Sequence, residues 1–75
     1  MVKDAFTLFL NDVKKIIRDE RRAMPVFINN RRRFGRPDGI TEAEFERNLR
    51  SEAVVKALKS FKFRVLNLLK EVGYP

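Results

Sequence analysis

Apolar residues in the first third of the chain recur at intervals of three and four positions. They are Val2, Phe6, Phe9, Leu10, Val13, Ile16 and Ile17. This spacing places side chains on one side of an α-helix, so it predicts a first helix from about Val2 to about Ala23. We expect Pro25 to end this helix, because a proline disfavours helical geometry in the residue before it.

A second helical pattern occupies the last third of the chain. Its apolar positions are Val54, Leu58, Phe61, Val65, Leu68, Leu69 and Val72. Gly73 follows as the expected stop residue. Upstream, Thr41 and Glu44 form a T-x-x-E capping box, which predicts a helix of about two turns from Glu42 to Arg50. Beyond Arg50 the pattern allows either a bend or a continuous run into the long C-terminal helix.

The middle of the chain is harder to assign. Residues 25–34, "PVFINNRRRF", are compatible with a short helix that begins at Pro25, where a missing N–H costs nothing. Phe27 and Phe34 are one heptad apart and would then share an inward face. The same residues are equally compatible with an irregular connection. "GRPDG", residues 35–39, is a turn signal, because proline presets one dihedral angle and glycine accepts a positive φ.

These patterns predict an all-α fold with no strand and no internal repeat. We expect a single domain, residues 1–75, built as a small bundle of three to four helices. The first and last helices would be long, and the central connection would be rich in arginine, glycine and proline. An apolar fraction of 44% with seven phenylalanines indicates a real core, although 75 residues is a marginal size for one. Whether one chain or a homodimer completes that core stays open.

The composition argues against catalysis. The chain contains no histidine and no cysteine, which excludes zinc sites built on these residues, cysteine nucleophiles and histidine-dependent triads. Glu42, Glu44 and Glu46 alternate along a helix and so point to different faces, unlike a catalytic carboxylate pair. We therefore predict a protein that is not an enzyme and uses no cofactor or metal.

The compartment and membrane predictions depend on the N-terminal stretch "MVKDAFTLFLNDVKK". Asp4 and Asn11 interrupt its apolar run, unlike the core of a signal peptide. No run is long enough to span a bilayer. Attachment to lipid through a basic amphipathic helix is disfavoured, because the apolar faces are needed for the core. We expect a cytoplasmic protein.

The net charge of +7 is the strongest signal in the composition. Residues 1–36 hold ten Lys/Arg against four Asp/Glu, and residues 54–75 hold five against one. Between them, residues 37–53 hold two basic residues against five acidic ones. Two basic blocks thus flank an acidic one, and such a field favours an anionic partner.

The leading functional hypothesis is a small regulatory or architectural protein that binds DNA or RNA. Arginine presents a planar fork to phosphates and guanine edges, so the predicted principal contacts are Arg31, Arg32, Arg33 and Arg36. The basic flank of the first helix would support them, through Lys14, Lys15, Arg18, Arg21 and Arg22. On the last helix, Phe63 projects among lysines that include Lys56 and Lys59, a combination used to stack bases and neutralise phosphates.

Two known modes of DNA binding bear on this hypothesis. Gly35, Arg36 and Pro37 resemble the end of the Arg-Gly-Arg-Pro core of AT-hook peptides, with Phe34 in place of the first core arginine. The resemblance covers only these few residues, and it implies that the loop enters a minor groove. A helix-turn-helix over residues 42–72 is disfavoured, because no glycine lies between Gly39 and Gly73 and the preceding stretch is acidic.

The alternative hypothesis is a protein-binding regulator that docks on an acidic surface of a larger partner, such as the transcription machinery. Small regulators of phages and other mobile elements are similar in size and charge. Phe63 and Leu8 would be the anchors in this case. Salt separates the hypotheses, because binding anchored by apolar side chains loses less affinity in salt than phosphate binding does.

Overall fold

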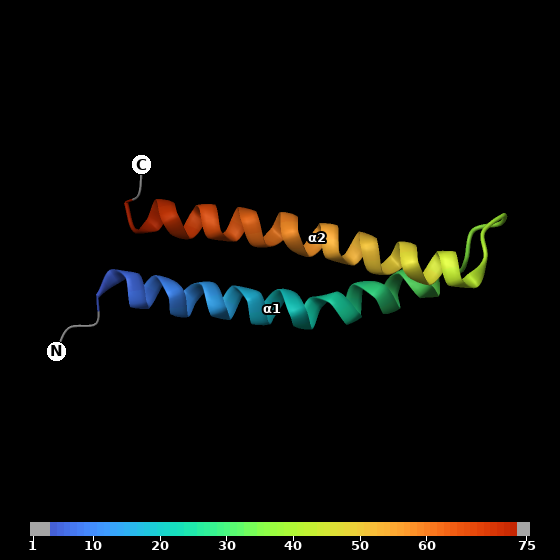
Figure 1. Cartoon of the computed structure of the whole chain (residues 1–75), viewed down its shortest axis with the longest axis horizontal. Coiled ribbons are helices and arrows are strands. Elements are labelled where there is room, and N and C mark those ends of the chain that lie inside the picture. Colours follow the sequence, from blue (N-terminus) through green and yellow to red (C-terminus); the bar gives the residue numbers. More distant parts are fainter. Residues whose placement is uncertain (1–3, 74–75) are drawn as a thin grey trace.

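The structure is a computed structural model that describes residues 4–73. It consists of two long helices, α1 (Ala5–Arg33) and α2 (Glu42–Glu71). Figure 1 shows them antiparallel and side by side, joined by a short turn at one end, with the start of α1 and the end of α2 together at the other. The hairpin measures 59 × 24 × 16 Å. Its radius of gyration is 17.1 Å, whereas a compact chain of this length would have about 11 Å.

The all-α prediction is confirmed, but the described chain has two helices where three or four were expected. The main reason is Pro25, which lies inside α1 rather than at its end. Ile16 before the proline and Phe27 after it both pack toward α2, so a break at Pro25 would turn one half of the helix away from its partner. Packing against α2 therefore outweighs the local preference of proline.

Phe34 does not share an inward face with Phe27, contrary to the heptad spacing. Phe27 is half-buried, whereas Phe34 is 86% exposed. Phe34 is the residue at which α1 ends, and its backbone N–H donates to the carbonyl of Arg31. It sits beyond the last turn that packs on α2, so the heptad no longer governs its direction.

α2 forms one continuous helix from Glu42 to Glu71. Its start is as predicted, since the Thr41 hydroxyl accepts a hydrogen bond of 3.1 Å from the Glu44 N–H. Its end is also as predicted, with Gly73 at a φ of 80° after the last turn. Because residues 42–71 form one helix, they do not provide the two helices of a helix-turn-helix.

The turn between the helices also matches its sequence signal. Gly35 and Gly39 have φ values of 85° and 90°, the left-handed conformation that side chains with a Cβ adopt only at a cost. α1 begins at Ala5, where the Asp4 carboxylate accepts a 2.7 Å hydrogen bond from the Thr7 N–H. This bond lowers the pKa of Asp4. Val2, the predicted first residue of the helix, lies outside the described residues.

The core is a narrow row of side chains between the helices. Among the described residues its buried apolar members are Ile16, Leu49 and Ala53. Phe6 and Leu10, which the spacing assigned to the apolar side of the first helix, are 67% and 39% exposed. One partner helix covers only part of the apolar surface of α1 and α2.

The proline inside α1 leads to a stability prediction. Pro25 has no N–H, so the carbonyl of Arg21 lacks its helical hydrogen bond. Pro25→Ala should raise the free energy of unfolding by about 1–3 kcal/mol, measured by urea denaturation followed by circular dichroism. Pro37→Ala, in the turn, is the matched control and should change stability by less than about 1 kcal/mol, with a slight loss. A loss of stability in Pro25→Ala would show that the proline aids packing against α2.

Candidate functional site

The arginine cluster of the sequence falls into two structural settings. Arg31, Arg32 and Arg33 form the last turn of α1, and only Arg36 lies in the turn that follows. Three positive side chains at a helix C-terminus interact favourably with its partial negative charge. The predicted arginine-rich loop is therefore mostly helix, and its side chains point in different directions around the helix axis.

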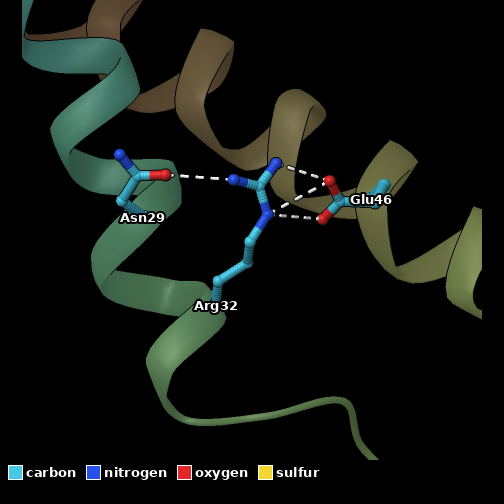
Figure 2. A network of polar contacts seen from close by, with 3 residues as sticks. All are labelled: Asn29, Arg32 and Glu46. Atoms are coloured by element: carbon cyan, nitrogen blue, oxygen red, sulfur yellow. Dashed lines mark hydrogen bonds and ion pairs between the residues drawn. The ribbon is translucent and has the colours of Figure 1, made fainter.

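Arg32 is held by a carboxylate of α2. Its Nε donates to both carboxylate oxygens of Glu46, at 3.1 and 3.0 Å, and a second guanidinium nitrogen contacts the same carboxylate. Another nitrogen donates to the Asn29 side-chain oxygen at 3.0 Å, as Figure 2 shows. The hydrogen bonds between the two groups raise the pKa of Arg32 and lower the pKa of Glu46. This arginine is already committed within the hairpin.

Arg31 is also held internally, though more loosely. Its Nε lies 3.6 Å from a carboxylate oxygen of Glu52, and its guanidinium lies 5.3 Å from the centre of the Phe27 ring. Both side chains of the ion pair are about half exposed, so the pair is screened by water and adds little stability. The acidic block of the sequence thus has a structural use, because it faces the arginines across the hairpin.

Arg33 and Arg36 are exposed, and within residues 4–73 neither makes an ion pair. Arg36 lines a shallow groove together with Arg32 and Glu42, beside the first turn of α2. Of the four predicted principal contacts, two are therefore occupied by carboxylates and two are open to a partner.

A larger basic surface lies along α1, on the side away from α2. At about 100° per residue, this side collects every third or fourth residue from Asn11 to Arg33. Its charged members are Lys14, Lys15, Arg18, Arg21, Arg22 and Arg33. All are exposed, and none is acidic. Together with Arg36 we call this surface the basic face; it extends over about 30 Å.

The acidic residues of the same stretch lie elsewhere. Asp19 and Glu20 point toward α2, where Arg64 contacts them at 3.1 and 3.8 Å. Glu20 also accepts a 2.9 Å hydrogen bond from the Ser60 hydroxyl. The negative charges of Asp19 and Glu20 therefore lie toward α2 and not on the basic face.

Arg64 is a residue of this region whose structural role the sequence did not predict. It stands in the helical row of Ala53, Ala57 and Ser60, which faces α1. A charged residue in such a row signals an oppositely charged partner on the facing helix. Asp19 and Glu20 were visible in the sequence, but the pairing depends on the register of the two helices.

The predicted contacts on α2 lie on another side of the molecule. Lys56 sits over the Phe27 ring, 4.6 Å from its centre. Lys59 and Phe63 are exposed on the same side of α2, Phe63 by 67%. They do not join the basic face, so the structure separates the candidate contacts into two surfaces.

Residues 4–73 contain no group of three acidic side chains arranged to hold a metal ion. In the same residues, neither helix has an apolar stretch long enough to cross a membrane. Comparisons of the sequence and structure with protein-family models, curated proteins and solved structures find no match.

Proposed function

We propose that this protein binds the phosphate backbone of nucleic acid through the basic face of α1. The observation that supports the proposal most is the absence of acidic residues from that face between Asn11 and Arg33. Six exposed Lys and Arg side chains share it, while Asp19 and Glu20 are paired with Arg64 on the other side of the helix. Such a surface concentrates positive potential where a polyanion can approach.

The chemistry of these residues fits phosphate contacts. Arg18, Arg21 and Arg22 present guanidinium groups, which bind phosphate oxygens in a bidentate manner. They line a shallow depression with Lys14 and the half-exposed Ile17. Phosphate contacts fix position without reading sequence, so the proposed activity is backbone binding of a regulatory or architectural kind. Arg33 and Arg36 extend the surface toward the turn.

The direct test is a fluorescence-anisotropy titration of labelled duplex DNA, single-stranded DNA and RNA with the native protein. We expect binding in the micromolar range or tighter at 50 mM salt. If about six phosphates are engaged on duplex DNA, affinity should fall by roughly a thousandfold between 50 and 200 mM salt. Absence of binding by the folded protein to all three probes at 50 mM salt would contradict the proposal.

A second candidate function is docking on an acidic protein surface, favoured by Phe63. Its ring is 67% exposed beside Lys59, so an apolar anchor lies next to positive charge. Aromatic side chains surrounded by other contact residues contribute much of the binding energy of many protein interfaces. Phe63→Ala would then abolish partner binding while leaving DNA binding by the basic face unchanged.

A further inference from the structure

A second apolar row runs along each helix beside the row that joins them. On α1 it consists of Phe6, Leu10, Ile17, Met24 and Ile28, and on α2 of Val54, Leu58, Phe61, Val65, Leu69 and Val72. None of these side chains is buried in the hairpin. Phe6, Leu58 and Val72 are 67%, 61% and 55% exposed. We call these two rows the apolar face.

The two rows lie on the same side of the hairpin. On each helix, the second row is rotated by about 100° from the interhelical row, in the direction in which the residue numbers increase. Ile17 thus follows Ile16 on α1, and Val54 follows Ala53 on α2. Because the helices are antiparallel (Figure 1), the same sense of rotation on both brings the rows to one side. A groove on the opposite side agrees with this geometry, because it is lined by Asp12 and Asn67, both displaced in the opposite sense.

A single hairpin leaves too much surface in water for a stable fold. Its accessible surface is 6469 Å² for a mass of 8.9 kDa. A compact monomer of that mass exposes about 4,800 Å². Among the described residues only Ile16, Leu49 and Ala53 are buried and apolar, and so small a core does not offset the conformational entropy of ordering two long helices. Something has to cover the apolar face.

We propose that a second copy of this chain covers the apolar face, so that two hairpins form a four-helix bundle. The face runs from Phe6 to Ile28 on α1, about 33 Å, and is two helices wide, about 20 Å. Such a contact removes about 1,300 Å² from water in total, within the range of stable dimers. Ile17 and Val65 lie near the middle of their rows. A two-fold axis through this layer therefore packs each row against the same row of the second copy.

Charge determines the orientation of the second copy. The positions seven and four residues before Val54, on the same side of α2, are Arg47 and Arg50. These two arginines mark the end of the apolar face that lies nearest the turn. If both turns lay at one end, the arginines of the two copies would meet across the contact. With the turns at opposite ends they lie beyond it, and α1 packs against α1 of the second copy.

This arrangement brings the basic faces of the two copies to one edge of the bundle. Lys14 and Arg21 flank the apolar face, so their counterparts come close together there. Salt screens this repulsion, and the dimer should therefore become tighter as salt rises, the opposite of nucleic-acid binding. The dimer itself does not depend on the proposed function, because the apolar face alone would form it.

Sedimentation of the native protein at about 100 µM tests the proposal. We expect twice the 8.9 kDa mass, with helix content and melting temperature that fall on dilution. Leu58→Glu should weaken the dimer at least a hundredfold, because it would bury a charge in the contact. Leu66→Glu is the matched control on the same helix. Leu66 is 47% exposed but lies off the apolar face, so its variant should remain dimeric.

Three outcomes would overturn the proposal. The first is a folded native monomer with full helix content at this concentration, which would assign the face to another partner. The second is a native protein that is monomeric and unfolded. The third is equal dissociation of the dimer by Leu58→Glu and Leu66→Glu, which would place the contact elsewhere.

The orientation has its own measurement. The chain has no cysteine, so Asp38→Cys introduces a single labelling site in the turn. With turns at opposite ends and the two-fold axis at Val65, the two spin labels of a dimer should be at least about 70 Å apart, and with turns at one end less than about 30 Å. The short distance would contradict the orientation proposed here.

Discussion

Replacing Leu49 with alanine should lower the free energy of unfolding by about 3 kcal/mol. Leu49 is 3% exposed and packs in the row between the helices, near the turn. The substitution removes buried surface and leaves a cavity that the surrounding side chains fill only in part. For so small a core this is a large fraction of the total stability, so most of the protein should be unfolded at moderate urea concentrations.

The control for this experiment is Leu66→Ala, the same change on the same helix. Leu66 is 47% exposed, and its loss should change the free energy of unfolding by less than about 0.5 kcal/mol. Both variants are compared with the native protein by urea denaturation at one protein concentration. Equal effects of the two substitutions would show that the interhelical row is not the core.

Removing Arg18, Arg21 and Arg22 together by substitution with alanine should weaken binding to duplex DNA about a hundredfold at 50 mM salt. This magnitude corresponds to about 1 kcal/mol for each phosphate that the three side chains would bind. Helix content should be unchanged, because the three side chains are exposed and alanine favours the helix.

The control is a triple variant of α2 in which alanine replaces Lys59, Lys62 and Lys70. It removes the same amount of positive charge, but from α2 and not from the basic face. It should weaken binding less than about fivefold, through the loss of long-range attraction alone. Similar effects of both triple variants on affinity would mean that net charge, and not the basic face of α1, drives binding.

Local signals in the sequence predicted both ends of α2. Thr41 with Glu44 marks the start of α2, and Gly73 its end, because caps depend on a few neighbouring residues. Pro25 shows the limit of such signals. Its local preference was outweighed by packing between Phe27 and α2, which depends on residues far away in the sequence.

The partners of the arginines were beyond prediction for a related reason. Arg31, Arg32 and Arg33 are identical in local chemistry, yet Glu52 and Glu46 hold the first two. The difference depends on the register of α1 against α2, which no local pattern determines. The negative charge of the acidic block predicts a position at a helix N-terminus. Only the three-dimensional structure shows that Glu46 and Glu52 also contact arginines of α1.

The width of the apolar stripe indicates how many neighbours each helix has. In α1 the apolar positions include both Phe9 with Ile16 and Phe6 with Ile17, which are two adjacent rows and not one. A single neighbouring helix covers only the first row, so two rows indicate two neighbours. The sequence predicted three to four helices, and the described chain contains two. Two copies would supply the four-helix bundle.

The measurement that tests the central proposal most directly is the salt dependence of DNA binding, compared between the native protein and the Arg18, Arg21, Arg22 to alanine variant. Removal of three phosphate-binding side chains should reduce the slope of log affinity against log salt by about 2.7. The α2 lysine variant should keep the native slope to within about 0.5. An unchanged slope in the arginine variant would contradict the proposal, since the basic face of α1 would then not touch the phosphates.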